Sequence, residues 1–154
     1  MPVHVGEMGP IKVNCLLWTG VVSRADAVGV PGRIDPALPK FGPRWISYFD
    51  TGVDLSDVDA AALLELRDNF RPVIAALAAK GPFKTILVSN SRYNDPLLAM
   101  WRTLSATDAG YAYDPELVPD IGSAARAHGL GAADSEQLRG WIEQQLGRTP
   151  ASPR

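Results

Sequence analysis

The stretch KTILVSNSRYNDPLLAMW, residues 84–101, decides the fold class of this chain. Residues 85–88 form a continuous run of β-branched and aliphatic side chains, which is typical of a strand covered on both faces. A polar turn follows, and then Asp95 and Pro96, a cap and first-turn pair that favours a helix start. A buried strand that leads directly into a helix indicates an α/β domain.

Apolar periodicity and turn signals predict the remaining elements on both sides of this stretch. The WISYF segment is an aromatic strand, and Pro72 is expected to kink or divide the helix that follows it. The predicted elements are, in chain order, a β-hairpin of residues 3–5 and 11–18, a strand at 45–49, a helix capped by Ser56 or Asp57 and ended by Gly81, the strand at 85–88, the helix from Asp95, a short strand at 111–113, a helix from about residue 120 to 128, and a last helix opened by Asp134 or Ser135.

This order predicts a mixed sheet, in which an antiparallel N-terminal β-hairpin is joined to parallel strands reached through helical crossovers. The length of 154 residues suits one domain with one core. We assign residues 1–147 to this single α/β domain and expect residues 148–154 to be a disordered tail. Residues 28–43, rich in proline and glycine, are expected to form a long loop.

Composition excludes several classes of function. The chain has 15 basic and 17 acidic residues and a formal net charge of −2, so no global field attracts nucleic acid or an anionic membrane. The N-terminal segment lacks the pattern of a signal peptide, and no apolar run is long enough for an integral membrane segment. The single cysteine fits a reducing compartment. We therefore expect a cytoplasmic protein whose partner is a small ligand or another protein.

Four segments carry a resemblance to a known family: TGVVSRAD, WISYFDTGVDLSDVD, ILVSNSRYNDPLLAMWRTL and SEQLRGWI. Their order and apolar pattern are similar to those of the SpoIIAA-like (STAS/SEC14-like) family of small bacterial domains. The resemblance implies a four- to five-stranded sheet with helices mainly on one face, and a ligand-binding or protein-interaction module rather than an enzyme. Some relatives are phosphorylated on a serine where this chain has Asp59 and alanines, so that acceptor is missing here.

The turn after residues 85–88 is the predicted ligand-binding site. It lies at the carboxyl end of a parallel strand, where open α/β sheets usually bind ligands, and Asp50 ends the preceding strand in the same way. The turn contains no glycine, which argues against a phosphate cradle. The candidate ligand-binding residues are Ser89, Asn90, Ser91, Arg92, Tyr93 and Asp50.

The sequence assigns no catalytic residue, metal ligand or cofactor. Cys15 lies on the inward phase of a strand, which favours a buried apolar role over a nucleophilic one. His4 and His128 are not spaced as metal ligands. The aspartates at positions 50, 54, 57 and 59 do not have the spacing of a calcium loop, and helix capping explains them better.

The leading functional prediction is a non-enzymatic domain that binds an apolar small ligand or a protein partner, with a regulatory role as one form of that function. Its four tryptophans are expected in the core, with a pocket or a homodimer face as the alternative for two of them. The competing prediction is a small enzyme or nucleotide-dependent switch with its site at the strand ends near Asp50 and residues 89–94.

Overall fold

The computed structural model describes residues 2–35, 37, 42–107 and 113–148 of the chain. One five-stranded sheet runs through it in the order β1-β2-β3-β4-β5. The strands are β1 (Val3–Met8), β2 (Val13–Trp18), β3 (Arg44–Phe49), β4 (Lys84–Val88) and β5 (Glu116–Val118). The helices are α1 (Arg24–Val28), α2 (Ala60–Ala79), α3 (Asp95–Ala106), α4 (Ile121–Ala127) and α5 (Ala132–Gln145), with short 3₁₀ turns η1 (Gly9–Ile11) and η2 (Val30–Arg33).

The predicted N-terminal hairpin is confirmed. Strands β1 and β2 pair antiparallel, from Val3 opposite Trp18 to Met8 opposite Val13. The turn between them is η1, and it closes at Lys12, whose φ of 54° is left-handed. Strand β1 continues to Met8 and is therefore longer than the sequence predicts.

The parallel part of the sheet is confirmed as well. Strands β2 and β3, β3 and β4, and β4 and β5 pair in parallel, and α1, α2 and α3 lie in the successive connections. The strand at residues 85–88 becomes the interior strand β4, with residues from Thr85 to Val88 all buried. The chain is thus an α/β protein with a mixed sheet, as its opening stretch predicts.

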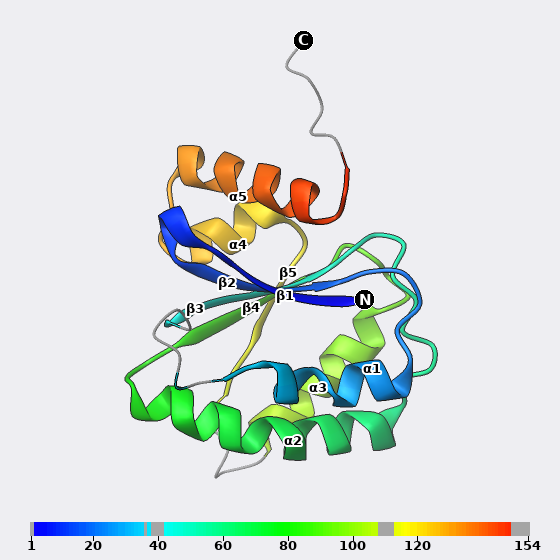
Figure 1. Cartoon of the computed structure of the whole chain (residues 1–154). Helices are drawn as coiled ribbons and strands as arrows, with labels where there is room; N and C mark the ends of the chain where they lie inside the picture. The colour runs from blue at the N-terminus through cyan, green and yellow to red at the C-terminus, as the bar shows by residue number, and fades with distance from the viewer. Residues whose placement is uncertain (1, 36, 38–41, 108–112, 149–154) are drawn as a thin grey trace.

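The helices cover both faces of the sheet, and not mainly one face. Figure 1 shows α1, α2 and α3 on one side of the sheet and α4 and α5 on the other. One core cluster joins Leu16, Trp45 and Leu87 to the first group of helices, and the second joins Leu17 and Ile86 to α4 and α5. Alternate residues of the same strands thus supply two cores, as the pleat requires.

Helix starts differ in detail from the prediction. Asp59, and not Ser56 or Asp57, caps α2, because its carboxylate accepts the N–H of Ala62 at 2.8 Å. At α3 the cap position belongs to Asn94, whose side chain makes no capping hydrogen bond, while Asp95 is already helical. These shifts of one to three residues reflect several neighbouring side chains that all suit a cap.

The structure changes one prediction at the level of whole segments, and others fall on residues that it does not describe. Helix α2 runs without interruption through Pro72. The last strand of the described residues is β5, whereas residues 111 and 112 of the strand predicted at 111–113 lie outside the described residues. In the proline- and glycine-rich loop, residues 36 and 38–41 lie outside that range too, as do residues 149–154 of the predicted tail.

Candidate functional site

The predicted ligand-binding turn is stabilised by its own hydrogen bonds, and its candidate side chains do not gather around one site. Ser89 is buried, its N–H donates to the Val118 carbonyl at 3.0 Å, and its hydroxyl accepts from the Ser91 N–H at 3.4 Å. The Ser91 carbonyl in turn accepts from the N–H of Asn94. Ser89 and Ser91 therefore serve to fasten the end of β4 to β5 and to shape the turn.

The other predicted site residues point in different directions. Arg92 is exposed, and Tyr93 is 97% exposed, so neither lines a cavity with the rest of the turn. Asn90 borders a pocket at the strand ends. Asp50 is not among the residues that line this pocket, but it forms an ion pair at 2.9 Å with Arg148, which does line it.

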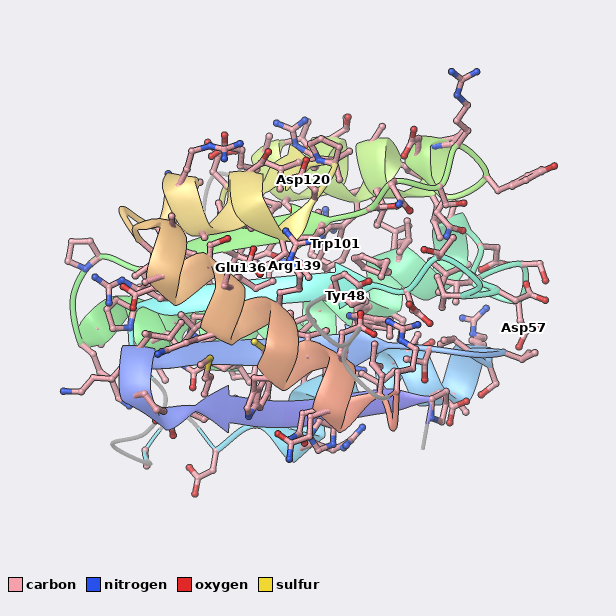
Figure 2. The ribbon with its side chains drawn as sticks, turned by 90° about the horizontal axis from the view of Figure 1, so that it is seen from above. Tyr48, Asp57, Trp101, Asp120, Glu136 and Arg139 are labelled. Carbon is pink, nitrogen blue, oxygen red and sulfur yellow. The ribbon has the colours of Figure 1, made fainter. Side chains whose placement is uncertain are left out.

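This strand-end pocket, about 480 Å³ in volume, follows from the topology. The connection after β4 leads to α3 on one face, whereas the connection after β5 leads to α4 on the other. Where neighbouring strands send their connections to opposite faces, a crevice opens at their carboxyl ends. The residues around it are Tyr48, Phe49, Val88, Asn90, Pro119, Asp120, Ile121, Arg139, Glu143 and Arg148. Tyr48 packs against the core cluster on the side of α4 and α5, and Figure 2 labels Tyr48, Asp120 and Arg139 in a view from that side.

The charged groups of the strand-end pocket pair with one another or with nearby groups. Arg148 binds Glu143 at 2.6 Å as well as Asp50, which fastens the end of α5 to the end of β3. The Asp120 carboxylate caps α4 through the Ser123 N–H at 2.7 Å, and this bond lowers its pKa. Burial raises the pKa of Tyr48, and Asp50 nearby adds to the rise. The pocket is thus a place where polar groups hold the fold together.

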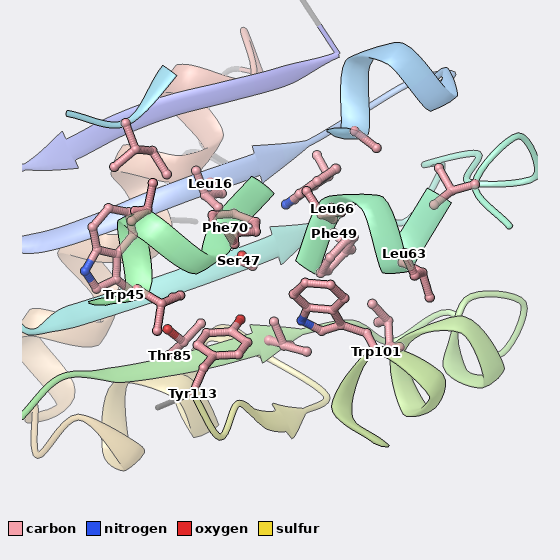
Figure 3. A pocket seen from close by; sticks show the side chains of 18 of the residues that line it. Leu16, Trp45, Ser47, Phe49, Leu63, Leu66, Phe70, Thr85, Trp101 and Tyr113 are labelled. Atoms are coloured by element: carbon pink, nitrogen blue, oxygen red, sulfur yellow. The ribbon is translucent and has the colours of Figure 1, made fainter. Parts of the chain in front are cut away.

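A second cavity, which we call the sheet–helix cavity, lies between the sheet and the helices α1 to α3. Its volume is about 70 Å³. Figure 3 shows Trp45, Ser47 and Phe49 projecting from β3 on the side occupied by α2 and by Trp101 of α3. The wall comes from the sheet and from the helices on this side of it, with Leu16 and Trp18 of β2, Leu63, Leu66 and Phe70 of α2, and Leu98 of α3 among its members.

The sheet–helix cavity exists at the centre of the sheet because a small residue stands there. Ser47 lies in the middle of β3, opposite Leu16 on one side and Leu87 on the other. Its strand neighbours on the same face are the large residues Trp45 and Phe49. A serine between two leucines and two aromatic residues leaves space that a larger side chain would fill.

Few polar groups lie in the described wall of this cavity, and the indoles of Trp45 and Trp101 and the Tyr113 hydroxyl are hydrogen-bonded. The Trp45 indole donates to the Gly42 carbonyl at 2.9 Å. The Tyr113 hydroxyl is hydrogen-bonded to the side chains of Trp101 and Thr85, and burial raises the pKa of Tyr113 to about 12. By contrast, the buried indole N–H of Trp18 has no acceptor among the described residues. Leaving such a donor unpaired costs about 1–3 kcal/mol.

Among the described residues the cavity wall contains no charged side chain. Transferring an ion into such surroundings costs several kcal/mol by order of magnitude, whereas an uncharged apolar molecule gains from leaving water. The wall therefore suits an uncharged occupant. The cavity volume is about 70 Å³. If each water-sized unit takes about 10–15 Å³, the cavity holds about five to seven non-hydrogen atoms.

The sequence located this cavity only in part. It allowed a pocket lined by two tryptophans, and Trp18, Trp45 and Trp101 all line it. The role of Ser47 was missed. The available signal was its position on the inward phase of WISYF, where alternation calls for a large apolar residue beside Trp45.

Cys15, His128 and the aspartates, which the sequence also offers as candidates, are buried or hydrogen-bonded within the fold. Cys15 is fully buried on the opposite face of the sheet, and burial raises its pKa to about 12, so the reactive thiolate is disfavoured. The His128 ring bonds the Trp45 carbonyl at 2.9 Å. No group of three or more potential metal ligands occurs within the described part of the chain. Asp54 and Asp57 accept backbone N–H groups, of Ser56 and Arg24 respectively.

Comparison of the chain with protein-family models, curated proteins and solved structures gives no match. The resemblance to SpoIIAA-like domains therefore stays a prediction. None of the helices in the described ranges combines the length and apolar character needed to cross a membrane.

Proposed function

We propose that the chain binds a small, uncharged, mainly apolar molecule in the sheet–helix cavity. The observation that supports this best is the central serine, which keeps space open inside a wall of aromatic and aliphatic side chains. A core under selection for stability alone gains from filling such space, since each buried methylene contributes about 0.8 kcal/mol.

Binding fits the surroundings better than catalysis does. The one thiol, Cys15, belongs to the opposite core cluster. In the cavity, the hydroxyls of Thr85 and Tyr113 are engaged with each other. A general base or nucleophile must reach its substrate in a reactive ionisation state, and neither Cys15 nor Tyr113 meets this condition.

The alternative, an enzyme or nucleotide-dependent switch at the strand ends, has one favourable observation. The strand-end pocket has a volume in the range of ligand sites and lies where the topology predicts one. Against it, Arg148 is engaged by Glu143 and Asp50, and the candidate Arg92 lies outside the pocket. An anionic ligand would have to displace these carboxylates.

A protein partner or a second copy of the chain is a further alternative. Four large apolar side chains in the described ranges are exposed, namely Val21, Leu64, Tyr93 and Met100. Singly exposed apolar residues are ordinary, so they favour an interface less than the cavity favours a ligand. We also keep the SpoIIAA-like resemblance and a cytoplasmic location as proposals, supported by the hairpin and parallel crossovers and by the single buried cysteine.

The proposed function is tested by a substitution that fills the cavity with a larger side chain. We expect wild-type protein to bind methylidenecyclopentane, a hydrocarbon of the right size, and Ser47→Ile to lose at least about tenfold in affinity because the added carbons occupy the space. Binding is measured by NMR titration. Ser47→Ala, which adds no volume, is the matched control and should bind as wild type does. No binding by folded wild-type protein, or equal binding by Ser47→Ile, would contradict the proposed function.

A further inference from the structure

We propose that the molecule bound in the sheet–helix cavity carries a carbonyl oxygen, as a small ketone, aldehyde, ester or lactone does, and that this oxygen accepts a hydrogen bond from the Trp18 indole. The inference rests on the proposed function, because it concerns the same cavity. It adds the chemical class of the ligand and the residue that recognises it.

Burial and a stacked ring contact hold the Trp18 side chain in place. Trp18 lies at the end of β2 and is 6% exposed, and its ring stacks on that of Phe49, with ring centroids 5.3 Å apart and planes inclined by 17°. Both rings line the cavity. A fixed aromatic plane also fixes the direction of its single N–H donor.

The other two indoles of the cavity show that the fold satisfies such donors where it needs no ligand. Trp45 donates to a backbone carbonyl, and Trp101 is hydrogen-bonded to Tyr113. Only the N–H of Trp18, among the indoles that line this cavity in the described residues, is buried without an acceptor. Buried donors are nearly always paired, so an acceptor from outside the chain is the natural complement.

The properties of that acceptor follow from the wall. An indole N–H donates and never accepts, so the ligand must supply an oxygen or nitrogen lone pair. The wall offers no charged partner, which disfavours a carboxylate or phosphate. The volume admits about five to seven non-hydrogen atoms. A carbonyl on a small ring or branched carbon frame meets all three conditions.

The experiment compares two probes of the same shape, cyclopentanone and methylidenecyclopentane, in which a methylene group replaces the carbonyl oxygen. We measure both dissociation constants by NMR titration for wild-type protein and for Trp18→Phe. Losing one neutral hydrogen bond should lower the preference for the ketone over the hydrocarbon about tenfold in the variant. In wild-type protein the Trp18 indole proton should shift downfield with the ketone and stay in place with the hydrocarbon.

The controls separate the two proposals. Trp45→Phe removes a lining indole whose donor is already satisfied, so it should change both affinities and leave their ratio as in wild type. Where Trp18→Phe does not fold, 3-benzothienylalanine at position 18 keeps the shape and lacks the N–H. If both probes bind and the ratio is the same with and without this donor, water satisfies Trp18 and the carbonyl inference is wrong, while the proposed function stands. If neither probe binds wild-type protein, the proposed function itself is wrong.

Discussion

His128 links two layers of the molecule through one ring nitrogen. Its Nε2 lies 2.9 Å from the Trp45 carbonyl, and because a carbonyl only accepts, the neutral ring donates from Nε2. Burial lowers the pKa of His128 below its usual 6.5, and the neighbouring Lys84 and Arg44 lower it further, against the effect of the Trp45 bond and Glu116. The folded protein therefore favours the neutral imidazole.

A pH dependence of stability follows for His128. Above pH 6.5 the ring is neutral in both states and its contribution is complete. As the pH falls below that value the unfolded chain takes up the proton first, so the free energy of unfolding decreases by up to about 1.4 kcal/mol per pH unit. Urea denaturation at about pH 7 and about pH 5 should show a smaller loss for His128→Gln than for wild type. Equal losses would mean that His128 titrates alike in both states.

Single residues also show where sequence reasoning succeeds and where it stops. The burial of Cys15 could be predicted, because alternation along a strand is a local property. The unpaired donor of Trp18 could not, since it depends on which acceptors β3 and α2 bring near it. The turn of residues 89–93 has the composition of a site, but only the structure shows that Ser89 is used internally and that Tyr93 faces away.

Strand β1 and helix α5 approach closely at a glycine. A Cβ at Gly6 would lie 3.1 Å from the Trp141 ring and 3.0 Å from Nε2 of His4. We therefore expect Gly6→Val to push the indole away and to lower the free energy of unfolding by about 1–3 kcal/mol. Thermal or urea denaturation measures the effect.

Gly140 provides the matched control on the same helix. A Cβ there meets no atom within 4 Å. Gly140→Ala should raise stability by about 0.5–1 kcal/mol, because alanine loses less backbone entropy in a helix. A stable Gly6→Val variant would show that Trp141 has room to move and that the contact does not set the distance between β1 and α5.

Elements were easier to predict than their ends. The apolar stripe of α2 marks a long helix, and packing of that stripe on the sheet keeps it continuous through Pro72 at the expense of one backbone bond. Its cap was misplaced, because Ser56, Asp57 and Asp59 offer the same chemistry within four positions. The distinction depends on a backbone conformation that composition does not encode.

At the scale of the whole molecule, the helices lie on both faces of the sheet, whereas the resemblance implied that they lie mainly on one face. The run from Thr85 to Val88, with β-branched or aliphatic side chains at successive positions, already indicated cover on both sides of β4. The one-sided arrangement came from the resemblance, and the residues contradict it. Local burial patterns were the better guide to the layers of this fold.

Arg148 joins the end of α5 to the sheet through two ion pairs. Its guanidinium binds Glu143 on α5 and Asp50 at the end of β3. Since the arginine side chain is 41% exposed, we expect Arg148→Ala to cost about 1 kcal/mol or less, with the difference from wild type shrinking as salt screens the pairs. Hydrogen exchange should rise in the last turn of α5. Unchanged exchange there would show that the apolar contacts of Leu138 and Ile142 hold α5 in place without the ion pairs of Arg148.

The uninterrupted strand order from β1 to β5 affects how the protein is made. Each strand pairs with the one synthesised just before it, so the sheet can grow as the chain leaves the ribosome. All the helices on the α1–α3 side have been synthesised once residue 106 has been added. On the other side, Leu17 and Ile46 stay uncovered until α4 and α5 have been synthesised. A nascent chain that pauses before residue 121 therefore presents a bare apolar sheet face to chaperones and to its neighbours. The time needed to translate the two last helices sets the period during which aggregation competes with completion of the fold.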